Sequence, residues 1–149
     1  MINPWLCRVA ASSAVLAWMG LIFYLSSLSQ AEVTRLLESP TVAWMGVLQS
    51  YAAHLVLYGV LCCLTMASVG SWKSAGAVCQ MRWAVAAATF ATMYGVSDEY
   101  HQSFAMGRSG SFGDILVNAF AATGTAIALC LMARWLRGRA ADLATVSPP

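Results

Sequence analysis

The sequence predicts an all-α membrane protein, folded as an antiparallel four-helix transmembrane bundle. The first observation is composition: 60% of its 149 residues are hydrophobic and 9% are charged, whereas a soluble domain carries about 25% charged residues. The second is the spacing of the charges. Residues 9–31, 39–72, 83–97 and 115–133 contain no Asp, Glu, Lys or Arg, and a helix needs roughly 20 apolar residues to cross a bilayer. This pattern excludes an ordinary soluble domain and a disordered chain.

The first predicted helix covers about residues 9–28. Its apolar run is longer than the roughly 7–15 residues of a secretory signal, so we expect a retained membrane anchor. Glu32, Arg35 and Glu38 follow at helical spacing with apolar residues between them. This pattern predicts a short amphipathic piece in the membrane interface, which is stopped by Pro40.

The second predicted helix lies within residues 44–69, and the third starts near Trp83. The third uncharged run rises only about 22 Å as a helix, which is short of a hydrocarbon core of about 30 Å. We therefore expect this helix to continue through Gln102. The fourth follows the loop 107–111 and runs to about Trp135.

The basic residues predict the orientation, because short cytoplasmic loops carry an excess of Lys and Arg. Six of the eight fall at the N-terminus, in the second loop and at the C-terminus: Arg8, Lys73, Arg82, Arg134, Arg137 and Arg139. Arg35 and Arg108 fall on the other side. We expect both termini in the cytoplasm, a four-helix domain over residues 1–139, and a flexible cytoplasmic tail over residues 140–149.

Small residues recur at four-residue spacing in the third and fourth predicted helices, which lets helix backbones approach closely in lipid. The rows are Ala84, Ala88 and Thr92; Ala87, Ala91 and Gly95; Ala122 and Ala126; Gly124 and Ala128. They predict tight packing and carry no chemistry.

Polar residues from all four predicted helices converge on the outer membrane level. For example, His54 lies 19 residues before Lys73, which is about 28 Å of helix. The converging residues are Ser26, Ser27, Ser29, Gln30, His54, Tyr58, Asp98, Glu99, His101, Gln102, Asp114 and Asn118. Ionisable groups at membrane depth are costly and usually face a bundle interior or a wet cavity, so the convergence predicts a site.

Each of these residues also has a structural interpretation. His54 and Asn118 suit hydrogen bonds between helices, and Asp98 and Glu99 suit solvation at the interface. Ser111 and Asp114 have the spacing of a capping box. Arg108 suits an interfacial anchor.

The chemistry of the site follows from its residue types. The segment from Gly107 to Ser111 leads into a helix N-terminus, where free N–H groups and a guanidinium suit phosphate. Histidines and carboxylates share acid and base roles. The predicted catalytic residues are His54, Asp98, Glu99, His101 and Asp114. The predicted substrate- and anion-binding residues are Ser27, Tyr58, Gln102, Arg108, Ser109, Ser111 and Asn118.

No cofactor is predicted. Two histidines and several carboxylates suffice in number for a divalent metal ion, but no spacing such as H-E-x-x-H is present. The five cysteines also lack metal-ligand spacing and suit small buried hydrophobic positions.

The chain resembles the VanZ-like family over nearly its whole length. The carrying residues are Ser97–Phe104 (Ser-Asp-Glu-Tyr-His-Gln-Ser-Phe), Gly107–Ser109 (Gly-Arg-Ser), Asp114 and Asn118, with Ser26, Ser27, His54 and Tyr58 in the first two helices. The resemblance implies a bacterial four-helix protein of the cytoplasmic membrane and a link to glycopeptide tolerance, since the founding member raises tolerance to teicoplanin. The chain departs from the family pattern at Met106 (usually Pro), at Ala121 (often Gly), and before His54, where a Lys is frequent.

Three function classes remain at this point. The first is an outer-leaflet enzyme, a hydrolase or transferase, acting on a lipid-linked or phosphate-bearing envelope substrate. The second is a non-enzymatic accessory protein that binds a lipid headgroup or a partner helix. The third is a proton-coupled transporter, which would need a second polar set near the membrane midplane that the sequence lacks. The expected partner is a membrane lipid or a lipid-linked envelope precursor. A net charge of +2 argues against nucleic acid, and the sequence does not predict the oligomeric state.

Overall fold

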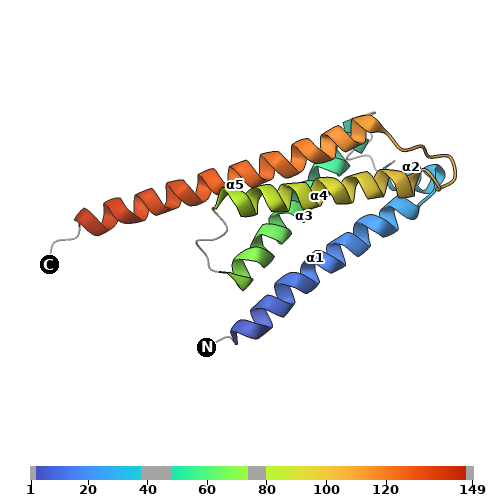
Figure 1. Ribbon diagram of the computed structural model, residues 1–149. Helices are drawn as coiled ribbons and strands as arrows, with labels where there is room; N and C mark the ends of the chain where they lie inside the picture. The colour runs from blue at the N-terminus through green and yellow to red at the C-terminus, as the bar shows by residue number, and fades with distance from the viewer. Residues whose placement is uncertain (1–2, 38–47, 74–79, 147–149) are drawn as a thin grey trace.

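The computed structural model describes residues 3–37, 48–73 and 80–146, and Figure 1 shows the arrangement of its helices. The elements are α1 (Pro4–Ser27), α2 (Gln30–Leu37), α3 (Leu48–Trp72), α4 (Met81–Gln102) and α5 (Phe112–Val146). The described residues form no strand. The predicted all-α class is therefore confirmed.

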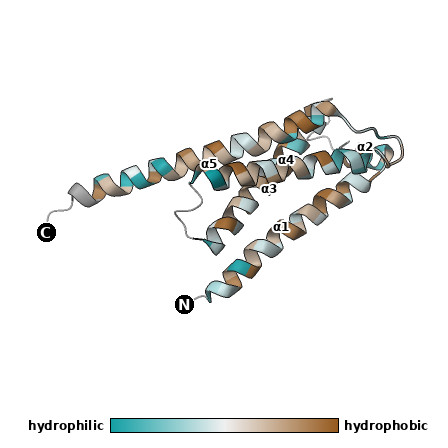
Figure 2. Ribbon diagram, in the orientation of Figure 1, coloured by the Kyte–Doolittle hydropathy of each residue, from teal (hydrophilic) through white to brown (hydrophobic). Residues whose placement is uncertain are grey.

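Three helices of the described chain are long and apolar enough to cross a membrane. They are Pro4–Ser27, Leu48–Trp72 and, within α5, Phe112–Leu143. Helix α4 is not among them, because Arg82 in its first turn and Asp98 and Glu99 in its last two turns lower its mean hydropathy. Figure 2 shows hydrophobic residues along the middle of the helices, with hydrophilic ones at α2 and along the C-terminal part of α5.

The helix ends follow local chemistry. α1 begins five residues earlier than predicted, since the Asn3 side chain accepts a hydrogen bond from the Trp5 N–H at 3.0 Å and Pro4 occupies the first turn. α4 runs through Gln102 as expected. α5 continues past Trp135 to Val146, because the sequence beyond Trp135 is rich in the helix formers Ala, Leu and Arg. Residues 140–146 of the predicted tail are thus helical, and the division at residue 139 stays a prediction.

Helix α2 is the predicted amphipathic piece, although Glu38 and Pro40 lie outside the described residues. It begins with a capping box that sequence reasoning missed. Glu32 Oε2 accepts from the Ser29 N–H at 2.8 Å and from the Ser29 hydroxyl at 2.6 Å. These donors hold the pKa of Glu32 below its ordinary value. The Gln30 N–H also donates to the Met106 carbonyl at 3.0 Å, which ties α2 to the loop before α5.

The helices pack so that α3 and α4 lie at the centre. α5 packs against α3 and α4, α1 packs against both as well, and α3 packs against α4. Figure 1 shows both termini at one end of the molecule, with α2 and the loop between α4 and α5 at the other. The loop between α4 and α5, which carries the predicted site residues Arg108, Ser109 and Ser111, therefore lies with α2 at the polar ends of α1, α3 and α4.

Small residues make these contacts close, as the sequence predicted for most rows. Ala87, Ala91 and Gly95 are buried along α4, and Ala122 and Ala126 are buried along α5. The prediction for the remaining row was wrong. Gly124 and Ala128 are exposed, because α3 and α4 cover only one side of α5 and this row faces away from them.

This packing predicts that replacing alanine by leucine destabilises the protein at a buried position and not at an exposed one. Ala91→Leu forces three extra carbon atoms into a site that is 0% exposed, so we expect a loss of about 1–3 kcal/mol. Ala128→Leu is the matched control, since the exposed residue has room for the larger side chain. Thermal unfolding in detergent measures both, and equal melting temperatures would contradict the packing.

Candidate functional site

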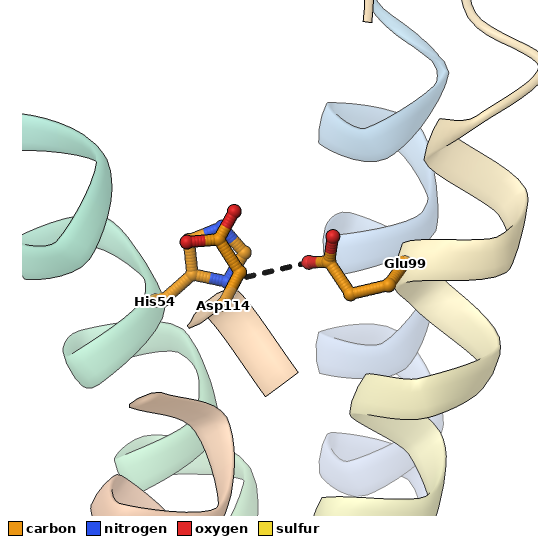
Figure 3. Close-up of side chains that lie close together, drawn as sticks. All are labelled: His54, Glu99 and Asp114. Carbon is orange, nitrogen blue, oxygen red and sulfur yellow. Dashed lines mark ion pairs between the residues drawn. The ribbon is translucent and has the colours of Figure 1, made fainter. Parts of the chain in front are cut away.

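His54 on α3 is the centre of a buried polar cluster. Its Nδ1 lies 2.9 Å from Asn118 Oδ1 and 3.9 Å from Glu99 Oε1, and its Nε2 lies 3.9 Å from Asp114 Oδ2. The side chains of His54 and Glu99 are 6% and 3% exposed, and that of Asp114 is 17% exposed. Figure 3 shows His54, Glu99 and Asp114 pointing toward one another. Three helices thus bring two carboxylates to one imidazole.

The loop before α5 holds the Glu99 carboxylate in place. Oε2 accepts a hydrogen bond from the Ser111 N–H at 2.9 Å, and Oε1 accepts one from Gln102 Nε2 at 3.4 Å. Gly110 makes this approach feasible, because a Cβ there would lie 2.7 Å from the Glu99 carbonyl oxygen. The loop therefore depends on a glycine at this position.

Helix capping explains the backbone N–H of Asp114 but not its carboxylate. The Ser111 hydroxyl accepts from the Asp114 N–H at 3.3 Å, which is the forward half of a capping box. The reverse half is absent, since the Ser111 N–H donates to Glu99. The Asp114 carboxylate is directed at His54 instead. The capping interpretation thus explains Ser111, and it leaves the acid for the cluster.

A second chain of hydrogen bonds runs from α1 to Arg108. The Ser26 hydroxyl donates to Asp98 Oδ1, and Gln102 Nε2 donates to Asp98 Oδ2 at 2.9 Å. Arg108 Nη2 donates to Gln102 Oε1, and Nη1 donates to the Leu25 carbonyl at 3.4 Å. Ser26, Asp98 and Gln102 are buried, so the carboxylate is satisfied by neutral donors.

A cavity of about 210 Å³ joins this chain to His54. Apolar side chains of α1, α2 and α3 form one part of its wall. Its polar lining consists of Ser26, Ser50, His54, Asp98, Gln102 and Arg108. A larger groove of about 320 Å³ lies between α4 and α5. Its lining is almost wholly apolar, so it offers no comparable chemistry.

Tyr58 and Asn118 are buried next to His54 and contact its ring. Both are 0% exposed, and the Tyr58 ring lies parallel to that of His54 with centroids 6.1 Å apart. Among the described residues, Tyr58 Oη and Asn118 Nδ2 have no hydrogen-bond partner. Gly95 leaves them room, since a Cβ there would lie 2.9 Å from Asn118 Nδ2 and 3.2 Å from Tyr58 Cε1. The small-residue row of α4 thus also shapes the site.

His101 and Ser27 lie apart from the buried cluster. Ser27 Oγ is 3.0 Å from His101 Nε2, and the His101 ring stacks on Phe23 with centroids 4.2 Å apart. Ser27 and Phe23 are exposed. Neighbouring residues are about 100° apart around a helix, so the rotation that buries Gln102 turns His101 toward the outer side of α1. The i, i+3 and i+4 spacing of Asp98, His101 and Gln102 predicts one shared helix face, but His101 lies apart from the other two. Its catalytic role stays a prediction.

The serines also differ in burial. Ser26, which was not predicted as a binding residue, is buried on Asp98, whereas the predicted Ser27 is exposed. Ser111 is half-buried as the cap of α5, and Ser109 is exposed on the loop. A sequence signal for Ser26 existed, because it ends α1 at the same membrane level as Asp98, but depth alone does not choose between adjacent residues.

The fold and the site define a small helical membrane protein whose buried polar cluster lies at one end of its apolar helices. The chain belongs to the VanZ/LLP1 family, whose model matches residues 12–135. The match confirms the resemblance and includes every residue of the cluster and the cavity. No curated protein and no solved structure matches the chain.

The two adjacent serines give a matched test of the site. Ser26→Ala removes a hydroxyl that donates to a buried carboxylate, and hydrogen bonds to charged groups contribute about 1.5–3 kcal/mol. Ser27→Ala removes an exposed hydroxyl, so we expect less than about 0.5 kcal/mol. Chemical unfolding in detergent measures both losses, and the reverse order would contradict the assignment of Ser26 to the site.

Proposed function

We propose that this protein is an integral enzyme of the bacterial cytoplasmic membrane that acts at the outer face on a lipid-linked, phosphate-bearing envelope substrate. One observation carries the proposal. A single cavity is lined by a guanidinium, Arg108, and by His54, whose ring contacts two carboxylates. An anion-binding group and an acid–base group therefore face the same space.

Arg108 has the capacity to hold a phosphate. A guanidinium carries five N–H donors, and the two hydrogen bonds to Gln102 and the Leu25 carbonyl use only some of them. The same bonds fix its position, which reduces the entropy cost of binding an anion. Leu25, Leu28 and Val33 line the apolar part of the cavity, which suits the first carbons of a lipid tail.

His54 has the environment of a general base. With Nδ1–H donating to Asn118 Oδ1, Nε2 carries the lone pair and faces Asp114. In the proposed reaction Nε2 accepts the proton of an attacking hydroxyl as its oxygen bonds to phosphorus. The bond from phosphorus to the leaving oxygen breaks, and His54 returns the proton to that oxygen. Asp114 stabilises the transient imidazolium.

The proposal includes four transmembrane helices with both termini in the cytoplasm. α4 has 22 residues, or about 33 Å, which is long enough to cross although its sequence is less apolar than the others. Its packing against α1, α3 and α5 supports burial of Asp98 and Glu99 within the protein. Six of the eight basic residues belong to the segments proposed to face the cytoplasm.

An accessory protein that only holds a lipid headgroup is the competing function, and it needs Arg108 but no base. The proposed role in glycopeptide tolerance is compatible with either function, because both concern envelope precursors. We therefore separate binding from turnover in the first test below.

Arg108→Gln is expected to weaken binding of a short polyprenyl phosphate in detergent micelles at least tenfold, which is about 1.4 kcal/mol. Arg35→Gln is the matched control, since Arg35 is exposed on α2 outside the cavity lining. His54→Gln should keep binding and abolish phosphate release from a polyprenyl diphosphate. Retained turnover in His54→Gln would exclude the enzyme, and equal binding by the two arginine variants would exclude the phosphate site.

The membrane orientation predicts which introduced cysteines react from outside the cell. In a variant without native cysteines, Ser109→Cys should react with an impermeant maleimide in intact cells or spheroplasts. Arg139→Cys should react only after the membrane is permeabilised, because we assign the C-terminal end of α5 to the cytoplasm. Labelling of Arg139→Cys in intact cells would invert or disprove the topology.

A further inference from the structure

We propose that His54, Glu99 and Asp114 bind one divalent transition-metal ion, Mn²⁺ or Zn²⁺. One ligand atom from each residue lies within 4.8 Å of the other two. The three residues come from α3, α4 and α5, so the fold and not a sequence motif assembles the set. Its connection to catalysis rests on the proposed function, whereas the binding of an ion does not.

The separations fit ligands of one ion better than direct hydrogen bonds. His54 Nε2, the ring nitrogen that Asn118 does not contact, lies 3.9 Å from Asp114 Oδ2. This distance exceeds the hydrogen-bond range. With bonds of about 2.0–2.2 Å to nitrogen and oxygen, two ligands of one ion lie about 3–4 Å apart. Figure 3 shows the three polar ends facing a common space.

Hydrogen bonds around the cluster leave the required lone pairs free. Asn118 Oδ1 occupies His54 Nδ1, and metal-binding histidines commonly donate their second N–H to such an oxygen. Ser111 N–H and Gln102 hold the Glu99 carboxylate. Within residues 3–37, 48–73 and 80–146, no hydrogen bond uses His54 Nε2 or an Asp114 carboxylate oxygen. Nε2 of the buried His54 ring thus faces the Asp114 carboxylate at 3.9 Å without a direct hydrogen bond.

The charge of the cluster also favours a cation. Glu99 is buried and Asp114 is nearly so, and in the described chain their ion pairs are with His54 alone. Arg108 is bonded to Gln102 and Leu25 instead. Buried carboxylates without compensation are costly. A divalent cation offsets both charges while His54 stays neutral.

The donor set selects the kind of ion. Ca²⁺ takes six to eight oxygen ligands, whereas one imidazole and two carboxylates suit Mn²⁺ or Zn²⁺. Three protein ligands leave at least one coordination position open, as in catalytic metal sites. His54 also lines the cavity with Arg108, so a phosphate oxygen or a water is near enough to occupy that position. The ion would polarise the phosphate or the attacking water, in place of proton transfer to His54, whose Nε2 lone pair it would occupy.

The test measures ion binding without any substrate. Chelator-treated protein in detergent is titrated with Mn²⁺, and free Mn²⁺ is followed by its electron paramagnetic resonance signal; Zn²⁺ is measured by competition. We expect one ion per chain, and at least tenfold weaker binding in Asp114→Asn and His54→Gln. His101→Gln is the matched control, since His101 contacts Ser27 and Phe23 rather than the cluster.

The outcomes separate this inference from the proposed function. Failure of the wild-type protein to bind either ion, or an equal loss in His101→Gln, would overturn the metal site. Asp114→Asn keeps the shape of the side chain, and its melting temperature shows whether it folds. Polyprenyl phosphate binding is measured on the same samples without metal. Binding of lipid phosphate but no ion leaves the proposed function standing and rejects the metal, and binding of an ion but no lipid phosphate does the reverse.

Discussion

The burial of two neighbouring carboxylates at the end of α4 governs the rest of this structure. Asp98 and Glu99 are 6% and 2% exposed, and such groups are stable inside a protein only when donors surround them. Because adjacent residues of a helix point about 100° apart, the two acids share only the Gln102 side-chain amide, and each has a further donor of its own. Asp98 takes Ser26 and Gln102, and Glu99 takes the Ser111 N–H.

These two sets of donors fix the geometry of the whole polar end. The bond from Ser26 docks α1 on one side of α4, and that from Ser111 docks the start of α5 on the other. Asp114, three residues further along, is then brought to His54 on α3. Small residues permit this convergence, since any Cβ at Gly95 or Gly110 would meet Asn118 or the backbone of Glu99. The lower hydropathy of α4 follows from the same requirement, because a helix surrounded by α1, α3 and α5 has less lipid to face.

The depth of the site was predictable from the sequence, whereas the direction of each side chain was not. Helical rise and the distribution of charge placed His54, Glu99 and Asp114 at one level. Rotation about a helix axis depends on packing, so depth could not separate Ser26 from Ser27 or send His101 to the outer face of α1. The exposed pair Gly124 and Ala128 was misassigned for the same reason.

Helix ends were predictable only where a local signal existed. Pro4 and Asn3 start α1, but the residues beyond Trp135 contain no strong stop, so the predicted end of α5 relied on hydropathy and came too early. Ser29 and Glu32 have the spacing of a capping box, which starts α2, whereas the amphipathic pattern of the segment does not indicate where the helix begins. Of the site residues, Arg108 was the one whose contacts were least predictable from the sequence. Its partners, Leu25 and Gln102, lie on two different helices.

His54 connects the two halves of the polar end, and this position constrains any mechanism. The ring lines the cavity with Arg108 and Asp98, and it is also the residue that touches Glu99 and Asp114. The cavity half is neutralised internally, since Arg108 and Asp98 are linked through Gln102. The cluster half retains an excess of negative charge. An anionic substrate is therefore attracted to Arg108 and repelled by the two acids unless a cation lies between them. That electrostatic asymmetry is the physical reason why phosphate chemistry at this site and a divalent ion at His54 support each other.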